Sequence, residues 1–343
     1  MTSAFLSQAV ENARPEFNEA RCVHDRAAGA SCKACADACP VGALALGEDA
    51  LELNVDACNG CMLCAAACPQ EAIDPGWQQI DNKLIRNGAI AYLTCAQAGL
   101  GKARQSMPCV HALGWRDALR LYAAGVRQIA VALGDCVGCD PQATQLERTV
   151  MHVNDMLRSR GLNELELRYL TNVQWKAEIR NASAVPTTSP QRRAFLRRFV
   201  NPDHEQRETD VPATVQELLG KSDPKSSVFP AVPVIDAQRC DGCDACTRVC
   251  STGALSLGGD RELYYVVDAS RCTGCRLCID VCQPDAISVR RWTTSPQQAL
   301  ALKSQRCRAC GVDYHAPTSR ADSLCTICST THHHRKLFQV DPV

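Results

Sequence analysis

Residues 240–282 read CDGCDACTRVCSTGALSLGGDRELYYVVDASRCTGCRLCIDVC, and the cysteine spacing in this stretch governs the structure expected around it. The stretch contains two runs of four cysteines, separated within each run by two, two and three residues. Each run is followed by alanine and an aliphatic residue. The same pattern recurs at residues 32–73, so the chain contains an internal repeat. The repeats come in pairs, and we expect each pair to form one small domain.

Three runs carry the complete spacing. They are Cys58, Cys61, Cys64, Cys68; Cys240, Cys243, Cys246, Cys250; and Cys272, Cys275, Cys278, Cys282. This is the spacing with which bacterial ferredoxins bind [4Fe–4S] clusters. Three thiolates in a tight loop can bind three corners of a cubane, while the fourth points toward the cluster of the partner repeat. The spacing therefore predicts two clusters for each pair of repeats.

The first run is irregular. Cys32, Cys35 and Cys39 match the last three ligands, but Gly29 stands where the first cysteine is expected. We take Cys22 as the substitute ligand, with residues 24–30 looping out. The alternatives are a three-ligand [3Fe–4S] cluster, or a lost cluster with Cys22 packed in the fold.

Exchange of the fourth ligands predicts four [4Fe–4S] sites. Their ligand sets are Cys22, Cys32, Cys35, Cys68 (first set); Cys58, Cys61, Cys64, Cys39 (second set); Cys240, Cys243, Cys246, Cys282 (third set); and Cys272, Cys275, Cys278, Cys250 (fourth set). Residues 20–80 and 233–293 resemble two dicluster ferredoxin domains, a family whose members carry single electrons. Ser251 after Cys250 and the shifted Pro284 depart from the family pattern, which affects local packing and potential rather than ligation.

Residues 86–175 alternate between strand-like and helix-like segments, which predicts a central α/β domain with a parallel sheet. The predicted strands are 88–94, 127–133 and 165–170, and the predicted helices are 117–124 and 146–157. Cys95 and Cys136 follow strand ends, and Cys109 lies close to one. Since sites form beyond the carboxyl ends of parallel strands, these cysteines and Cys139 are expected to converge.

This segment resembles the delta subunit of methyl-viologen-reducing hydrogenase, which is also found fused to heterodisulfide reductase. The similarity lies in the strand before Cys95, the piece around Met107–Cys109, and the stretch 118–136 with the helix and strand that follow. It implies a [2Fe–2S] cluster bound by Cys95, Cys109, Cys136 and Cys139. The family often has a second cysteine where Ala98 stands, so a single Zn²⁺ and a set of redox-active or buried thiols remain alternatives.

Two further segments complete the organisation. Residues 180–232 are rich in proline, serine, threonine and charge, which predicts a linker with one short helix near Val215–Leu219. Residues 303–332 carry Cys307, Cys310, Cys325 and Cys328 as two C-x2-C pairs. Their spacing predicts a zinc-ribbon-like site for one Zn, with a rubredoxin-type iron as the alternative. His332, His333 and His334 are expected to form a solvated tail.

Charge and composition narrow the functional classes. Lys and Arg total 37 and Asp and Glu total 37, so the formal net charge is zero. Each thiolate-bound centre adds about −2, which takes the loaded protein to about −12 and argues against nucleic-acid binding. The 24 cysteines lie in tight clusters in a long chain without an export signal, which favours metal sites over disulfides and a cytoplasmic location. We expect no transmembrane segment.

The sequence thus predicts a multidomain α/β and α+β protein that relays single electrons, a polyferredoxin. The redox partner is expected to be an enzyme complex, such as a formate dehydrogenase, a hydrogenase or a heterodisulfide-reductase-like complex. We expect an electron-transfer subunit of an oxidoreductase complex rather than an enzyme. The alternatives are an iron–sulfur subunit with its own reductase activity and a zinc-rich binding protein.

Overall fold

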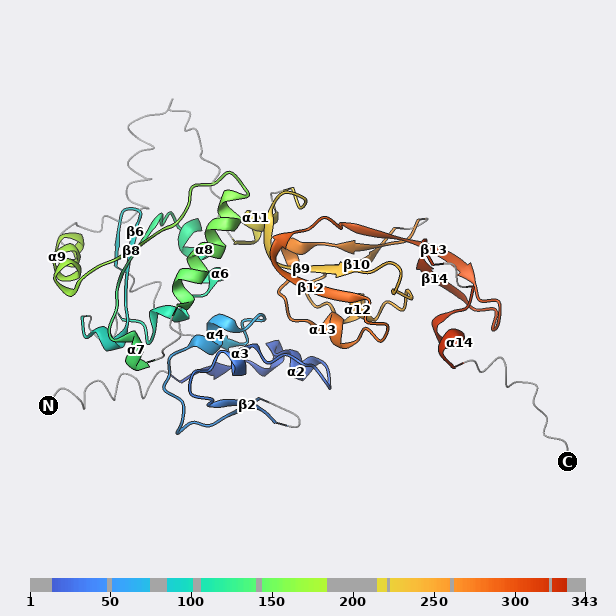
Figure 1. Ribbon diagram of the computed structural model, residues 1–343, viewed down its shortest axis with the longest axis horizontal. Helices are drawn as coiled ribbons and strands as arrows, with labels where there is room; N and C mark the ends of the chain where they lie inside the picture. Colours follow the sequence, from blue (N-terminus) through green and yellow to red (C-terminus); the bar gives the residue numbers. More distant parts are fainter. Residues whose placement is uncertain are drawn as a thin grey trace, which may run out of the picture. The chain divides into compact units, whose positions relative to one another are not determined.

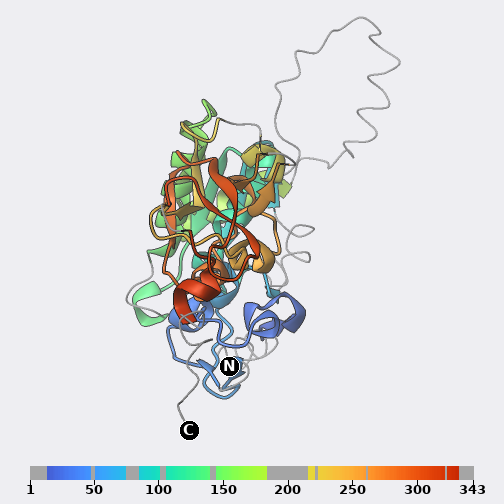
Figure 2. The same cartoon turned by 90° about the vertical axis from the view of Figure 1, so that its right-hand side faces the viewer.

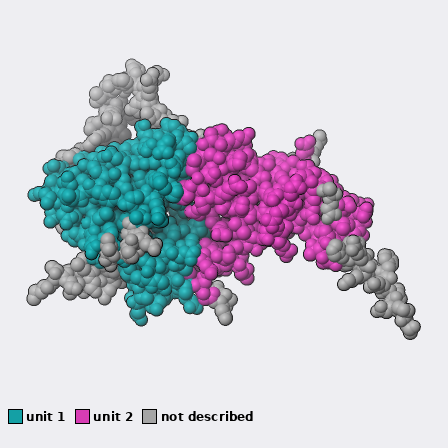
Figure 3. Space-filling model, viewed as in Figure 1, with its two compact units in different colours: residues 1–18, 34–45, 52–218 teal, residues 19–33, 46–51, 219–343 magenta. Residues whose placement is uncertain are grey.

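The computed structural model describes nine segments of the chain: residues 14–47, 51–74, 85–100, 106–139, 144–183, 215–220, 223–259, 262–320 and 323–331. The chain forms two compact units (Figure 3). Unit 1 consists of residues 1–18, 34–45 and 52–218, and unit 2 of residues 19–33, 46–51 and 219–343. These limits differ from the five segments expected from the sequence, and that division stays a prediction.

Unit 1 contains the predicted parallel sheet (Figure 1). Its strands are β5 (Ile85–Asn87), β6 (Ile90–Thr94), β7 (Gln128–Ala132) and β8 (Glu166–Tyr169), in this spatial order. The pairs β6–β7 and β7–β8 are parallel, which confirms the expected topology. β5 pairs antiparallel with β6 and was not expected, because three residues carry too little periodicity to be recognised in the sequence.

The helices of this α/β part bury one face each. They are α6 (Trp115–Ala123), α8 (Gln145–Arg158) and α9 (Asn172–Ser183). The predicted apolar stripe of α8 is confirmed, since Leu146, Val150, Val153 and Leu157 are all buried. α9 was not predicted and extends into the expected linker. It is anchored by Trp175, whose ring packs edge-on against Tyr92 of β6 with the centroids 5.8 Å apart.

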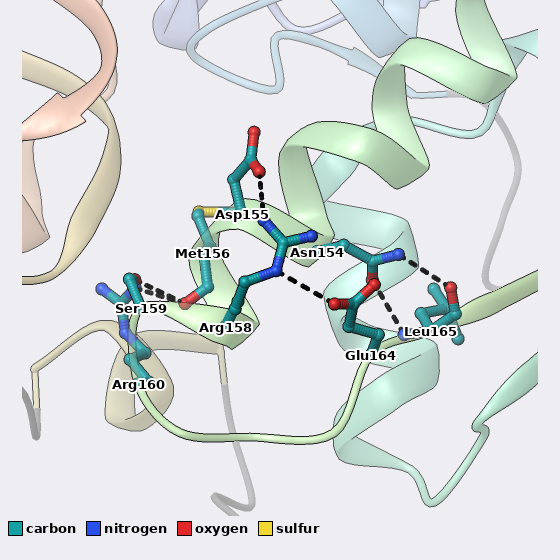
Figure 4. Close-up of polar contacts among 8 residues, drawn as sticks. All are labelled: Asn154, Asp155, Met156, Arg158, Ser159, Arg160, Glu164 and Leu165. Carbon is teal, nitrogen blue, oxygen red and sulfur yellow. Dashed lines mark hydrogen bonds and ion pairs between the residues drawn. The ribbon is translucent and has the colours of Figure 1, made fainter.

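Polar contacts fix the end of α8 to the start of β8 (Figure 4). The Asn154 side chain donates to the carbonyl of Leu165 at 3.0 Å and accepts from its N–H at 2.8 Å. Arg158 bonds Asp155 and Glu164 at 2.9 and 3.0 Å. Because the Arg158 ion pairs are solvent-exposed, we expect the amide clamp of Asn154 to contribute more to stability.

The repeats of the first dicluster region form short elements. These are β1 (Glu16–Phe17), η1 (Glu19–Arg21), α2 (Val23–Arg26), α3 (Ala34–Asp37), β2 (Leu44–Leu46), β3 (Leu51–Leu53), α4 (Leu63–Ala67) and β4 (Ile73–Asp74). Within unit 1, α4 packs against the 3-10 helix η3 (Val110–Ala112) of the α/β part. The Arg116 guanidinium donates to the carbonyl of Pro69 at 2.9 Å. A Cβ at Gly114 would lie 3.5 Å from the backbone of Ala66, so the two parts are in close contact.

Unit 2 contains two antiparallel sheets (Figures 1 and 2). One pairs β9 (Val228–Ile235) with β12 (Ile287–Thr294), and the other has the order β10 (Leu255–Gly258), β11 (Tyr264–Val267), β13 (Ala299–Arg306), β14 (Asp313–Pro317). Besides η1 and α2, which lie in residues 19–33, its described helical elements are α11 (Val215–Gly220, which begins in unit 1), α12 (Ala245–Val249), η4 (Ala269–Arg271), α13 (Leu277–Asp280) and α14 (Thr326–Thr331). α11 confirms the short helix expected near Val215.

Two parts of unit 2 differ from the sequence expectation. Residues 228–232, assigned to the linker, belong to β9. Pro230 and Pro233 suggested a linker, but β9 pairs only with β12 among the described strands, and a proline is tolerated where the second side of a strand needs no N–H donor. The C-terminal four-cysteine segment continues the second dicluster region, because β13 pairs with both β11 and β14.

The core of unit 2 includes predicted ligands. Cys240 and Cys246 are buried in one cluster with Ile235, Tyr265 and Ile287. These thiols contribute to the core as small apolar groups. The expected inorganic group would lie between them and complete the core. Among the described helices, none has both the length and the apolar character needed to cross a bilayer.

The central strand β7 should determine the stability of the α/β part. Ile129 is fully buried, so Ile129→Ala should destabilise this part by about 2–5 kcal/mol through lost burial and a residual cavity. Amide hydrogen exchange of peptides covering 128–132 should accelerate by about 30-fold or more. Val173→Ala removes a side chain that is 78% exposed and should leave this exchange unchanged; equal effects would contradict the assignment of β7 to the core.

Candidate metal centres

The three complete cysteine runs share one loop conformation. The residue before each second cysteine is a left-handed glycine, namely Gly60, Gly242 or Gly274. The residue after it is also left-handed although it carries a side chain: φ is 65° at Met62, 63° at Asp244 and 68° at Arg276. This conformation costs about 1–2 kcal/mol for a residue other than glycine. Its recurrence at equivalent positions indicates that the loop geometry is imposed by the common function of the cysteines.

The first run lacks this loop. Lys33 and Ala34 lie between its cysteines, and α3 begins at Ala34. His24 donates to the carbonyl of Cys32 at 2.8 Å, which ties α2 to the start of the run. Cys22 and Cys32 belong to unit 2, whereas Cys35 and Cys68 belong to unit 1, so the first set is divided between units and stays a prediction.

Every fourth cysteine accepts a backbone hydrogen bond on its sulfur. The donors are the N–H groups of Ala43 to Cys39 (3.2 Å), Ala72 to Cys68 (3.3 Å), Leu255 to Cys250 (3.4 Å) and Ala286 to Cys282 (3.2 Å). Such bonds stabilise the negative charge of a thiolate. In three repeats the donor is the alanine four residues on. After Cys250, which Ser251 follows, the donor is one residue further on, at Leu255.

The crossed pairing agrees with the cavities that the cysteines form. Cys39 lines one small cavity with Cys58, Cys61 and Cys64, which is the second set. Another small cavity is lined by the fourth set, Cys250, Cys272, Cys275 and Cys278. In both cavities the fourth cysteine comes from the partner repeat, as the crossed arrangement requires.

Members of the third set pack together in the core of unit 2: Cys240 and Cys246 are buried in one cluster, and Cys282 packs against it. Burial, with smaller contributions from the neighbouring thiols of Cys240, Cys243 and Cys282, raises the pKa of Cys246 to about 12. A buried thiol with a raised pKa stays protonated until a metal displaces the proton, so these groups are suited to a bound cationic core rather than to free thiolates.

The central cysteines lie at the expected edge of the sheet. Cys95 follows β6, Cys136 begins the short helix α7 (Cys136–Cys139) after β7, and Cys109 precedes η3. Gly134 donates its N–H to the Cys95 sulfur at 3.4 Å. A Cβ at Gly134 would lie 2.7 Å from the backbone carbon of Gln97, so the two strand-end loops require glycine there.

All four central cysteines line a cavity of about 830 Å³ within unit 1. The same cavity is lined by Cys39 and Cys61 of the second set. Burial raises the pKa of Cys109 to about 12, and the neighbouring thiols of Cys61, Cys95 and Cys136 add to this shift. Two predicted metal centres therefore adjoin one cavity.

The C-terminal cysteines form the tightest group. The sulfurs of Cys307, Cys310, Cys325 and Cys328 all lie within 4.8 Å of one another. The Cys310 and Cys325 sulfurs are 3.8 Å apart, and tetrahedral Zn–S bonds of about 2.3 Å require an S–S separation of about 3.8 Å. A cubane, whose cysteines bind different iron atoms, needs wider spacing. The group fits one metal ion, and His332–His334 lie outside the described residues.

Backbone donors prepare this site for a cation. The Cys325 N–H bonds the Cys307 sulfur at 3.3 Å. This bond, with others from the Cys310 and Ala309 N–H groups, lowers the pKa of Cys307 to about 6. The loop that carries Cys307 is closed by its own N–H, which donates to the Val312 carbonyl at 2.8 Å.

The β13–β14 hairpin, which leads into this site, contacts the loop of the third set. His315 of β14 lies 2.8 Å from the Asp244 carboxylate, which also accepts from the Tyr265 hydroxyl at 2.7 Å. A Cβ at Gly242 would lie 2.2 Å from the His315 carbonyl oxygen, and Arg320 reaches the Cys240 carbonyl at 3.5 Å. The hairpin thus covers the loop between Cys240 and Cys246.

Sequence reasoning missed three of these features. It did not identify the N–H donors to the fourth cysteines, although the repeated alanine was a visible signal for them. It did not place Asp244, Tyr265 and His315 together, because they come from three separated segments. It also gave no indication that the central cysteines share a cavity with the second set, which depends on the packing of α4 against η3.

Comparison with known families agrees with the two repeat pairs. The model of the 4Fe-4S dicluster domain matches residues 30–72 and 239–286. The second match contains all eight cysteines of the third and fourth sets, and the first contains seven, since Cys22 lies outside it. No curated protein matches the chain.

The C-terminal group should bind one ion independently of the clusters. Cys328→Ser removes a buried ligand and should lower the metal content by one ion per chain with little change in iron–sulfur content. Ile327→Ala, at an adjacent side chain that is 66% exposed, should keep the ion. Elemental analysis of anaerobically purified protein measures both, and it identifies the ion as zinc or iron. Unchanged metal content in Cys328→Ser would show that these cysteines bind none.

Proposed function

We propose that this chain, which carries two 4Fe-4S dicluster domains, is a polyferredoxin that relays single electrons between a redox enzyme complex and another carrier. The observation that carries the proposal is the gathering of cysteines from partner repeats around common cavities, with a backbone N–H directed at each fourth sulfur. When bound, [4Fe–4S] clusters supply one-electron storage at potentials set by charge, hydrogen bonds and exposure.

The chain's own residues would control this chemistry. The N–H groups of Ala43, Ala72 and Ala286 stabilise negative charge on the sulfurs. In the second and fourth sets, the three thiols of each left-handed loop line one cavity. Buried aliphatic residues such as Leu277 exclude water from the fourth set, which limits loss of the inorganic group to solvent.

We assign Cys95, Cys109, Cys136 and Cys139 to a [2Fe–2S] cluster. The shared cavity supports a direct route between this centre and the second set, because ligands of both line it. Arg116 and Gly114 hold the α/β part against the repeat that carries Cys68, so the spacing of the two centres is fixed by packing. The [2Fe–2S] centre would then serve as the point where electrons enter or leave the first dicluster domain.

We assign zinc to the C-terminal group. The compact spacing of its sulfurs supports a single ion, and few aromatic side chains surround it: Tyr314 is the one packed against the cysteines in the described part of this segment. Zinc has no redox chemistry, so its role would be to hold the hairpin over the third set. The redox partner would be a formate dehydrogenase, a hydrogenase or a heterodisulfide-reductase-like complex.

The proposed function predicts a definite metal content. Anaerobically purified protein should contain about 18 iron atoms, with matching sulfide, and one zinc per chain. Cys61→Ser removes a ligand of the second set and should lower the iron by about four atoms, with weaker EPR signals after dithionite reduction. Val55→Ser, at a side chain that is 39% exposed in the same repeat, should keep all the iron. A colourless protein with several zinc ions and no iron would contradict the function.

A further inference from the structure

The second dicluster domain places opposite charges at equivalent positions of its two cysteine runs. Asp244 and Arg276 each follow the second cysteine of a run and share the left-handed backbone, with φ of 63° and 68°. The corresponding residue of the first dicluster domain is the uncharged Met62. The backbone positions are matched, so the difference between the two loops lies in their side-chain charge.

The loop of the third set is negatively charged. The Asp244 side chain is 17% exposed, and its carboxylate accepts from the Tyr265 hydroxyl at 2.7 Å and lies 2.8 Å from the His315 ring nitrogen. Burial raises the pKa of Cys240 to about 11, and the carboxylate of Asp241 adds to this shift. Two carboxylates therefore lie beside the sulfurs that would bind the third cluster.

The surroundings of the fourth set are positively charged. Arg276 lines the cavity of this set. A Cβ at Gly274 would lie 2.8 Å from the Arg291 guanidinium, and one at Gly253 would lie 3.1 Å from the Arg271 guanidinium, so both cations lie against the cysteine loops. Burial raises the pKa of Cys272 to about 11, and Arg291 opposes this shift.

Other charges near these loops reduce the difference. Arg320, whose guanidinium reaches the Cys240 carbonyl at 3.5 Å, is a cation at the third set. Arg248 lies 3.9 Å from Asp244, but its side chain is 76% exposed, and such pairs are weak in water. Asp280 is the last residue of α13, near the fourth set, and its carboxylate accepts two hydrogen bonds from Ser31 at 3.0 and 2.6 Å. The third set has two carboxylates against Arg320 and the screened Arg248, whereas the fourth has three guanidinium groups against one carboxylate. The surroundings of the third set are therefore the more negative of the two.

We propose that Asp241 and Asp244 on one side, and Arg271, Arg276 and Arg291 on the other, form an electrostatic gradient that makes the fourth cluster easier to reduce than the third. This inference rests on the proposed function. Reduction adds one electron, from an external low-potential donor, and no bond or proton changes place. Since added negative charge is repelled by carboxylates and attracted by guanidinium groups, the electron moves from the Asp244 side to the Arg276 side.

Matched substitutions test the gradient. Asparagine tolerates the left-handed backbone, so Asp244→Asn and Arg276→Asn change the charge at equivalent positions and keep the loop. Midpoint potentials are measured on the full chain by EPR-monitored titration at about pH 8, where an ordinary histidine is neutral. The signals are assigned with Cys243→Ala and Cys275→Ala, which remove one ligand from each set.

Asp244→Asn should increase the ratio of reduced to oxidised third cluster about tenfold at fixed potential, an upward shift of about 59 mV. Arg276→Asn should decrease the reduced fraction of the fourth cluster by a smaller factor, because Arg276 is exposed and more strongly screened. In the double variant the two potentials should converge. Arg290→Gln removes a neighbouring charge of β12, on the face opposite Arg291, and should shift neither potential.

The outcomes separate this inference from the function it rests on. Full iron content with unshifted potentials, or with shifts of the opposite sign, would overturn the gradient and leave electron transfer intact. If a charge variant does not fold, the wild-type protein still tests the gradient. In the wild type, the signal that Cys275→Ala removes must have a higher midpoint potential than the signal that Cys243→Ala removes. Absence of iron–sulfur signals from the wild type would overturn both.

Discussion

The binding of inorganic centres by cysteine thiolates is the interaction on which the cysteine repeats of this structure depend. The described elements of the repeats are short, and α3, α4, α12 and α13 are single turns that would not persist alone. Predicted ligands such as Cys240 and Cys246 lie within the buried core of unit 2. Buried thiols repel one another once ionised, so the loops need a cation between them. Metal binding and folding are therefore one process for these regions.

The α/β part follows a different principle, and its fold could be predicted more fully. The apolar stripe of Leu146, Val150, Val153 and Leu157 and the buried run at 128–132 gave α8 and β7 correctly, because periodicity reports burial against a sheet. β9 was missed because its prolines suggested a linker. The attachment of β13 to β11 was missed because pairing between strands distant in sequence leaves no local signal.

The candidate sites likewise contain features that the sequence predicts and features that depend on tertiary packing. The cysteines of the second set line one cavity and those of the fourth set another, as the spacing led us to expect, and their assignment as cluster ligands stays a prediction. The groups that tune the sites were beyond sequence reasoning: Asp244 meets His315 only through the hairpin, and Arg291 meets Gly274 only through β12. The repeats supply equivalent scaffolds, and the side chains brought in by neighbouring elements make each site different.

The most direct measurement removes the iron and follows the fold. Anaerobic treatment with an iron chelator and an oxidant, followed by amide hydrogen exchange, compares the repeat peptides in 239–286 with the strand peptide at 128–132. The account predicts that the repeat peptides lose nearly all protection, whereas the strand peptide of the α/β part keeps most of its own. Equal protection of the repeat peptides before and after iron removal would contradict the claim that the bound centres form their core.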